Sequence, residues 1–219
     1  MKVKICGISN EIDTFNAINN GADLIGFVMG GKVLPIEVEP YAQNVRQIIK
    51  KFPKNVKSFL VTHLLSADDI LALSQYINCT GIQVSEDIDE EEMKKVRKNF
   101  KGEIIKTIVS NYDDAEDKMK IYEKYCDYYL FDSRNSNYTG GTGVENDWEK
   151  TATLLAKTQK PCFIAGGLTP ENVQTAINIT NPFGVDVSTG VSHFSESYLK
   201  KDRKDLNKIK KFIELAKRN

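Results

Sequence analysis

The sequence is short of the residues that mark several specialised classes of protein. Its 219 residues include two histidines, four cysteines and one tryptophan, and thirty basic side chains balance thirty acidic ones. A net charge of zero gives no overall field to attract nucleic acid or an anionic membrane. No apolar run is long enough to cross a bilayer, and the first residues do not read as a signal segment. We therefore expect neither a nucleic-acid partner nor a membrane partner.

The cysteines also exclude more than they suggest. Cys6, Cys79, Cys126 and Cys162 show no paired spacing, and three of them lie in or beside apolar stretches. Reduced thiols of a cytoplasmic protein fit this pattern better than a disulfide framework does. Zinc favours closely spaced pairs of ligands, which these positions do not provide.

What the sequence does contain is a regular alternation of short apolar runs and amphipathic stretches. The runs, bounded by Gly, Pro, Asn or Asp, predict strands at Val3–Cys6, Leu24–Met29, Lys57–Thr62, Gly81–Val84, Glu103–Val109, Tyr128–Phe131, Pro161–Ile164 and Gly184–Val187. The stretches between and after them predict helices at Glu11–Asn20, Tyr41–Phe52, Ala67–Tyr76, Glu90–Phe100, Asp113–Tyr125, Trp148–Lys157, Pro170–Ile179 and Lys200–Arg218. Ser66 and Thr169 stand at two of the expected helix starts, the second followed by Pro170.

Eight strands, each followed by a helix, match a closed (β/α)8 barrel. An open doubly wound sheet uses the same alternation, but its usual plan has six strands, and no G-x-G-x-x-G follows the first strand. The length fits one large domain or, at a stretch, two small ones. The prediction is an α/β protein with a single (β/α)8 TIM barrel over residues 1–219.

Two reactive side chains stand at strand ends that such a barrel brings to one face. Cys6 ends the first expected strand and Asp132 follows the sixth. Lys4 should lie one layer below Cys6, and closure would pair it with Asp186 on the eighth strand, so that the ammonium favours a thiolate. Each has a plainer alternative: Cys6 as a small buried apolar residue, and Asp132 as a turn or cap residue.

Glycines and hydroxyl residues follow the last two strands. Gly166 and Gly167 follow the seventh, and Ser188, Thr189 and Gly190 follow the eighth. Barrel enzymes commonly hold phosphate between these loops with backbone amides, so we expect a phosphate site here; tight turns chosen for geometry are the alternative. A further loop, Gly140-Gly141-Thr142-Gly143, also offers uncovered amides.

The remaining polar features carry plainer expectations. His63 and His193 are each isolated in a polar loop, and we expect surface histidines. The basic run Lys200-Lys201-Asp202-Arg203-Lys204 predicts a solvated face at the start of the last helix.

Six segments resemble the phosphoribosylanthranilate isomerase family of tryptophan biosynthesis, in family order over nearly the whole chain. They are Lys4–Ile8, Gly21–Val28, Phe131–Ser133, Gly140–Gly143 with Asp147-Trp148, Ala165–Val173 and Pro182–Val191. The resemblance implies a (β/α)8 barrel that performs an Amadori rearrangement of a phosphoribosyl amine to a 1-amino-1-deoxyribulose 5-phosphate.

The resemblance also implies roles for residues. Asp132 would be the general acid at the ring oxygen, and Cys6 the general base at C2. The remaining contacts to the substrate would come from Lys4, Lys32, Gln83, Gly141, Gly143 and Asp186, with the 5′-phosphate on Gly166, Gly167, Ser188, Thr189 and Gly190. No metal or organic cofactor is implied. The only partner expected is a small phosphorylated sugar amine, and the chain would be a monomer or a homodimer.

The chain departs from the family pattern where the aglycone would bind. The loop after the second strand has no arginine before Arg46, and Lys32 is the only nearby cation. The fourth strand ends in Ser85-Glu86, where the family usually has His-Gly, and the third ends in Thr62 in place of Asn. Three hypotheses stay open: the classical isomerase, a related isomerase with another aglycone, and a non-catalytic barrel that binds a sugar phosphate.

Overall fold

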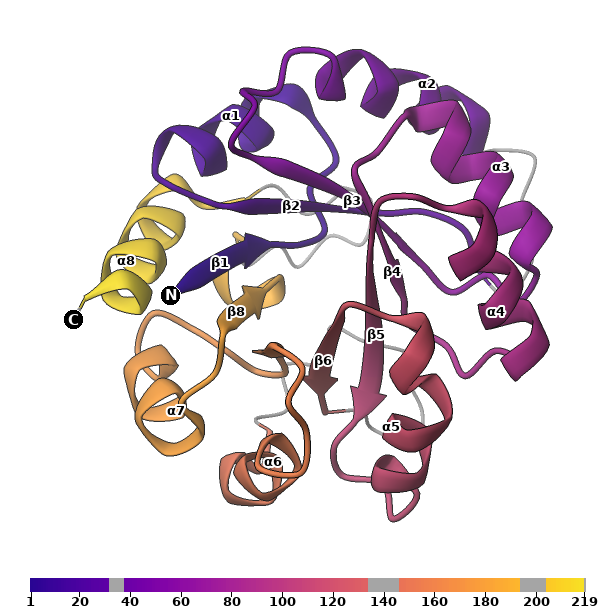
Figure 1. The fold of residues 1–219 in the computed structure, drawn as a ribbon. Coiled ribbons are helices and arrows are strands. Elements are labelled where there is room, and N and C mark those ends of the chain that lie inside the picture. The colour runs from indigo at the N-terminus through magenta and orange to yellow at the C-terminus, as the bar shows by residue number, and fades with distance from the viewer. Residues whose placement is uncertain (32–37, 134–145, 194–203, 219) are drawn as a thin grey trace.

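The computed structural model describes residues 1–31, 38–133, 146–193 and 204–218. The chain forms one closed barrel of parallel strands in the order β1 to β8, with the helices packed around its outside (Figure 1). This confirms the predicted (β/α)8 fold class. None of the helices in the described ranges is long and apolar enough to cross a membrane.

The element boundaries are close to those expected from sequence, except that the last helix begins at Leu206 and not at Lys200. The strands are β1 (Lys2–Ile5), β2 (Leu24–Val28), β3 (Lys57–Thr62), β4 (Gly81–Val84), β5 (Glu103–Val109), β6 (Tyr128–Asp132), β7 (Cys162–Ile164) and β8 (Gly184–Val187). The helices are α1 (Glu11–Asn19), α2 (Val38–Ile49), α3 (Ala67–Ile77), α4 (Glu90–Asn99), α5 (Ala115–Tyr122), α6 (Trp148–Leu155), α7 (Val173–Thr180) and α8 (Leu206–Lys217), with short 3-10 turns η1 (Glu123–Tyr125) and η2 (Thr189–Val191).

The start of α7 differs from the prediction. Pro170 lies in a turn, and the helix begins three residues later, at Val173. Thr169 and Asn172 explain the delay, since the Thr169 hydroxyl accepts from the amide of Glu171 and the Asn172 side chain accepts from the amide of Thr169. Side chains thus bond the amides of the turn, and no helical turn is needed there. Ser66, by contrast, caps α3 as predicted.

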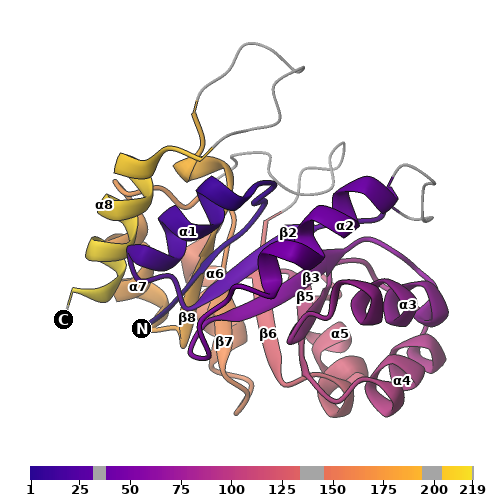
Figure 2. The same ribbon diagram turned by 90° about the horizontal axis from the view of Figure 1, so that it is seen from above.

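Closure of the barrel joins the two ends of the chain. β1 pairs with β8 in the register Lys4↔Asp186, and α8 packs beside α1 (Figures 1 and 2). At the far end of α8, the ammonium of Lys217 donates to the carbonyl of Gly21 at 2.7 Å. The last helix is therefore fixed next to the first strand.

Two apolar layers fill the structure. The larger lies between strands and helices. The smaller fills the inside of the barrel and is made of Leu24, Phe59, Ile105, Leu130, Phe163 and Ala165. Positions that alternate with the outer layer along each strand therefore face inward, as the period of two requires.

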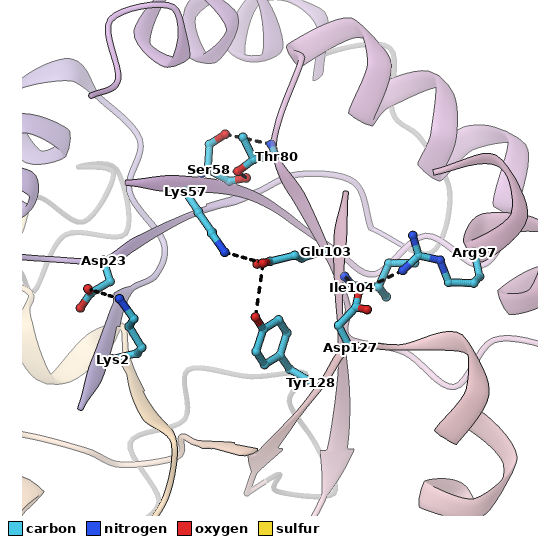
Figure 3. A network of polar contacts seen from close by, with 10 residues as sticks. All are labelled: Lys2, Asp23, Lys57, Ser58, Thr80, Arg97, Glu103, Ile104, Asp127 and Tyr128. Atoms are coloured by element: carbon cyan, nitrogen blue, oxygen red, sulfur yellow. Dashed lines mark hydrogen bonds and ion pairs between the residues drawn. The ribbon is translucent and has the colours of Figure 1, made fainter. Parts of the chain in front are cut away.

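Charged side chains close the amino-terminal end of the barrel by pairing with one another. Glu103 accepts from the ammonium of Lys57 and from the hydroxyl of Tyr128, and Asp127 accepts from Arg97 at 2.9 Å (Figure 3). Lys2 and Asp23 add a further pair at 2.9 Å. Because these charges bond to one another, this end has the character of the stabilising face of a TIM barrel.

Candidate active site

Cys6 lies at the carboxyl end of β1, directly above Lys4. Its amide donates to the carbonyl of Val187 at 2.8 Å, and the residue is 7% exposed. A Cβ placed on Gly26 of β2 would stand 3.0 Å from the Cys6 sulfur and 3.1 Å from Lys4 Nζ. The thiol and the ammonium therefore share the small space inside the barrel that Gly26 leaves open.

The predicted ion pair is confirmed, because Lys4 Nζ donates to Asp186 Oδ2 at 3.0 Å with both residues buried. Burial lowers the pKa of Lys4, but the carboxylate of Asp186 and the thiol of Cys6 outweigh it, and the pKa is raised. The ammonium is thus charged beneath the candidate site.

The ammonium of Lys4 acts on Cys6 in the predicted direction, since it lowers the pKa of the thiol, but burial outweighs this effect. Burial raises the pKa of the Cys6 thiol, and Asp186 adds to the rise, while Lys4 and Lys204 only oppose it. The sulfur is almost wholly removed from water, and loss of hydration disfavours the thiolate more than the ammonium groups favour it. Cys6 rests as a neutral thiol.

Two buried acceptor atoms face the same interior without a hydrogen-bond partner in the described structure: Asp186 Oδ1 and Gln83 Oε1. Gln83 donates to the Thr107 hydroxyl at 3.1 Å. This bond fixes the side-chain amide group and leaves its oxygen as an unused acceptor. An unsatisfied buried acceptor costs about 1–3 kcal/mol, so such atoms indicate a ligand that brings donors. Sequence reasoning had assigned both residues to substrate binding.

Asp132 is the last residue of β6 and is partly exposed. In the turn after β7, Gly166 has φ +92°, and a Cβ there would stand 2.9 Å from Asp132 Oδ1 and 2.5 Å from the Ser133 hydroxyl. Only glycine accommodates both this backbone angle and this approach. The carboxyl group and the first candidate phosphate turn are therefore neighbours.

Asn146 ties the same region together and was missed by sequence reasoning. Its Oδ1 accepts from the Ser110 hydroxyl at 2.6 Å, and its Nδ2 donates to the Ala165 carbonyl at 3.1 Å. The Ser110 amide donates to the carbonyl of Asp132 at 3.0 Å. The side chain of Asn146, which is buried, thus links the ends of β5, β6 and β7. Its place in the chain gave no signal, because Glu-Asn-Asp reads as an ordinary loop.

The two turns predicted to hold phosphate lie together. Gly166 and Gly167 both have positive φ, of +92° and +65°. In η2, a Cβ on Gly190 would stand 1.9 Å from the carbonyl oxygen of Leu168, so the turn after β8 touches the one after β7. Ser188 and Thr189 lead into this contact. The fold brings all five predicted phosphate residues to one place.

Lys204 was expected in a solvated basic run and is instead buried, at 5% exposure. Its Nζ donates to the Ser188 carbonyl at 2.9 Å and to the Ser192 hydroxyl at 3.2 Å. The expectation failed because Lys204 pairs with Ser192 in an isolated antiparallel bridge before α8 begins, which turns its side chain under η2. Residues 200–203 of the run lie outside the described residues.

Each histidine has a carboxylate partner that was not expected, although His193 is a surface histidine as predicted. His63 Nδ1 lies 2.7 Å from Glu86 Oε1, and the His63 amide donates to the carbonyl of Gly30. His193 Nδ1 lies 3.4 Å from Asp205 Oδ2, although this ring is 59% exposed. His63 and Glu86 follow the adjacent strands β3 and β4. They are 23 residues apart in the sequence, so nothing in the sequence indicated that they pair. Buried Ser85 precedes Glu86 at the same mouth.

Three further residues with expected substrate contacts, Lys32, Gly141 and Gly143, lie outside the described residues. Cys6, Lys4, Gln83, Asp132, Asp186 and the phosphate turns are all described. They stand at or just below the carboxyl ends of the strands, opposite the paired charges of Figure 3.

Comparison with known proteins gives one consistent result. The family model described as N-(5'phosphoribosyl)anthranilate (PRA) isomerase matches residues 3–215. The N-(5'-phosphoribosyl)anthranilate isomerase of Methanothrix thermoacetophila is 31% identical over 97% of this chain and 96% of its own. The phosphoribosyl anthranilate isomerase of Thermotoga maritima superimposes with a TM-score of 0.81 at 27% identity, covering 99% of this chain and 98% of that one.

A further solved phosphoribosyl anthranilate isomerase is in complex with reduced 1-(o-carboxyphenylamino)-1-deoxyribulose 5-phosphate. It superimposes with a TM-score of 0.78 at 26% identity, over 99% of this chain and 98% of that chain.

Proposed function

Because the chain belongs to the N-(5'-phosphoribosyl)anthranilate isomerase family, we propose that it isomerises N-(5-phosphoribosyl)anthranilate by an Amadori rearrangement, with Asp132 as acid and Cys6 as base. One observation carries the proposal: the orphaned acceptors Asp186 Oδ1 and Gln83 Oε1 lie in the interior that the Cys6 thiol also borders. A sugar with several hydroxyl groups supplies the donors that these atoms lack.

The first step opens the ribose ring. Asp132 gives its proton to the ring oxygen as the bond between that oxygen and C1 breaks, and the lone pair of the aglycone nitrogen forms a C1=N iminium. The partial exposure of Asp132 at the mouth of β6 leaves it within reach of a bound sugar. Its neighbour Gly166 belongs to the turn proposed for the phosphate, which fixes the sugar relative to the acid.

The second step moves a proton from C2. The Cys6 thiol first releases its proton to water, and the thiolate then takes the C2 proton. The C2–H electrons form a C1=C2 enolamine as the C1=N electrons return to nitrogen, and tautomerisation gives the 1-amino-1-deoxyketose. The burial that raises the pKa of Cys6 makes the thiolate a stronger base once formed. Lys4 and Lys204, which both favour the thiolate, would stabilise it during the step.

The phosphate and hydroxyl contacts follow from the same frame. Gly166, Gly167 and the Ser188–Gly190 segment would hold the 5′-phosphate through amides and hydroxyls. Asp186 would accept from a sugar hydroxyl through Oδ1 while Lys4 holds Oδ2. The related isomerase bound to a carboxyphenylamino-deoxyribulose 5-phosphate supports a phosphorylated substrate. We propose the cytoplasm as the place of the reaction, in keeping with four free cysteines.

A second candidate function is a related isomerisation with a different aglycone. The pair His63–Glu86 favours it, because it places a carboxylate at the mouth of β3 and β4. Another carboxylate, such as that of anthranilate, would be repelled there unless the histidine is protonated. An aglycone with a hydrogen-bond donor would suit the pair better.

A fluorescence assay with phosphoribosylanthranilate tests the proposal. Asp132→Asn and Cys6→Ser should each lower kcat by about 100-fold or more, the usual scale for loss of a general acid or base. Asp127→Asn, at the opposite end of the barrel, and Cys79→Ser, between α3 and β4, are the matched controls and should keep their activity.

The outcomes separate the candidates. Turnover that both active-site variants lose and both controls keep supports the classical reaction. Binding of ribose 5-phosphate without turnover of phosphoribosylanthranilate favours the second candidate. Turnover of phosphoribosylanthranilate that survives Cys6→Ser and Asp132→Asn overturns the roles proposed for these two residues.

A further inference from the structure

Lys204 approaches the candidate phosphate site from below, and we propose that it is a positioning residue that orients Ser188 and supplies the positive charge that holds the 5′-phosphate. The inference rests on the proposed function, because it needs a phosphate between the turns after β7 and β8. Neither the basic run in the sequence nor the barrel plan assigns this role.

Three contacts of the ammonium point into the second phosphate turn. Lys204 Nζ lies 2.9 Å from the Ser188 carbonyl oxygen, 3.4 Å from the Ser188 hydroxyl and 3.2 Å from the Ser192 hydroxyl. Ser188 enters η2 and Ser192 leaves it, so one cation bonds both ends of the turn. A donor to the Ser188 oxygen leaves the hydroxyl proton of Ser188 to point elsewhere, toward a ligand oxygen.

The main chain of Lys204 is held from two sides, so the fold determines where its ammonium lies. The Lys204 amide donates to Asp13 Oδ2 of α1 at 3.1 Å, and Ser192 pairs with Lys204 in an antiparallel bridge. The next amide, that of Asp205, donates to the Val191 carbonyl at 2.8 Å. A solvated lysine would have none of this anchorage.

The same ammonium also reaches the turn that follows β1. Gly7 has φ +69°, and a Cβ there would stand 2.7 Å from the Ser188 hydroxyl and 3.5 Å from Lys204 Nζ. The Cys6–Gly7 backbone, the Ser188 hydroxyl and the ammonium therefore meet at one point. Lys204 is also one of the groups that lower the pKa of Cys6 against its burial.

The two candidate phosphate turns, residues 166–168 and 188–190, carry no charged side chain of their own. Backbone amides and hydroxyls give a phosphate dianion hydrogen bonds but no full positive charge, and a buried ammonium interacts strongly with it because little water screens the pair. Lys4 is already held by Asp186 on the sugar side. Lys204, which hydrogen-bonds to the turn after β8, is placed for the phosphate.

Lys208 is the natural control. It lies on α8 four residues further on, and its Nζ donates to the Ser192 carbonyl at 3.1 Å. It thus supports the same segment from outside, without the contact to Ser188.

The test is the affinity of the full chain for ribose 5-phosphate, measured by calorimetry, with ribose as the uncharged comparison. Lys204→Met and Lys204→Gln should weaken ribose 5-phosphate binding by about 10-fold or more, as expected for loss of a charge-assisted partner. Lys204→Arg should keep most of the affinity, Lys208→Met should change it by less than about 2-fold, and ribose binding should not change in any variant. With substrate, the Lys204 variants should show a raised KM.

Three results would overturn the inference. Folded Lys204→Gln or Lys204→Met with wild-type affinity for ribose 5-phosphate excludes the role of the charge. Equal losses of ribose 5-phosphate affinity in Lys208→Met and Lys204→Met would mean that Lys204 only supports the segment structurally. If the wild type binds ribose 5-phosphate no better than ribose, the phosphate site of the proposed function fails together with the inference. Thermal unfolding of Lys204→Gln beside Lys204→Arg separates misfolding from lost affinity.

Discussion

Asp186 holds Lys4 with one carboxylate oxygen and leaves the other oxygen without a partner among the described residues. The ammonium and the carboxylate lie inside the barrel, where the loss of hydration is costly for both. The pair therefore matters for stability as well as for holding Oδ1 toward the candidate sugar position.

Removal of Lys4 should destabilise the protein strongly. Lys4→Met leaves the Asp186 carboxylate buried and unpaired, which costs about 3–5 kcal/mol of the free energy of unfolding. Lys2→Met, on the same strand, breaks only the exposed pair with Asp23 and should cost less than about 1 kcal/mol. Urea unfolding of both variants measures the difference; similar losses would contradict the importance of the interior pair.

A methyl group on Gly166 should damage activity more than stability. In Gly166→Ala the new Cβ would collide with Asp132 Oδ1 and the Ser133 hydroxyl, displacing the proposed acid. Gly21→Ala is a matched control, since Gly21 has φ +99° but its nearest contact is 3.6 Å away. Both should lose about 1–2 kcal/mol of stability from the left-handed backbone.

Activity separates these two glycine variants. Only Gly166→Ala should lose most of its turnover of phosphoribosylanthranilate at saturating substrate. Equal activity in the two variants would contradict a catalytic role for Asp132.

The reactivity of Cys6 should rise with pH later than that of an ordinary thiol. Burial raises its pKa; Asp186 adds to this, while Lys4 and Lys204 oppose it. Alkylation by iodoacetamide needs the thiolate. The pH at which the alkylation rate of Cys6 reaches half its maximum should therefore be higher in the native chain than in the urea-unfolded chain. Peptide mass spectrometry resolves Cys6 from Cys79. A lower native midpoint would contradict the assignment.

The same shift has a consequence for stability, with a definite sign. A folded pKa above the unfolded one means that the contribution of Cys6 to stability is full below the ordinary thiol pKa. It is lost as the pH rises through the raised value, because the unfolded chain releases the proton more readily. Cys6→Ser should therefore flatten the alkaline decline of the free energy of unfolding.

The pair His63–Glu86 should affect how tightly the aglycone of the substrate binds. Glu86→Gln removes a carboxylate from the mouth of β3 and β4, and if anthranilate binds there, KM for phosphoribosylanthranilate should fall by about 3- to 10-fold with little change in kcat. His63→Ala should raise KM. His193→Ala, which alters the exposed pair with Asp205, should leave both constants unchanged. Unaltered KM in Glu86→Gln would place the aglycone elsewhere.

The parts of the fold and site that sequence predicts are those governed by short periods. Alternation along β1 and β8 places Lys4 and Asp186 on inward faces, and closure then makes them neighbours. Gly166 and Gly167, in the turn after β7, have the positive φ that glycine tolerates best, so the residue type itself indicates a turn there. Local patterns of this kind were enough to predict the barrel and most of the described site.

Residues that depend on long-range placement were not predictable. Lys204 is one of several basic residues in its run, and nothing local shows that its side chain turns inward. His63 and Glu86 come from different loops. The sign of the pKa shift at Cys6 depends on weighing burial against charge, and a sequence gives the charges but not the loss of hydration.

Barrel closure has a consequence for synthesis of the protein. Lys4 and Asp186 are 182 residues apart, and β1 pairs with β2 on one side and with β8 on the other. While the ribosome is still adding the later strands, the first strand carries a cation with no counter-charge and a thiol with no cover. The nascent chain therefore has a reactive, accessible sulfur until nearly its last helix is made, and oxidants or a chaperone would meet Cys6 in that interval.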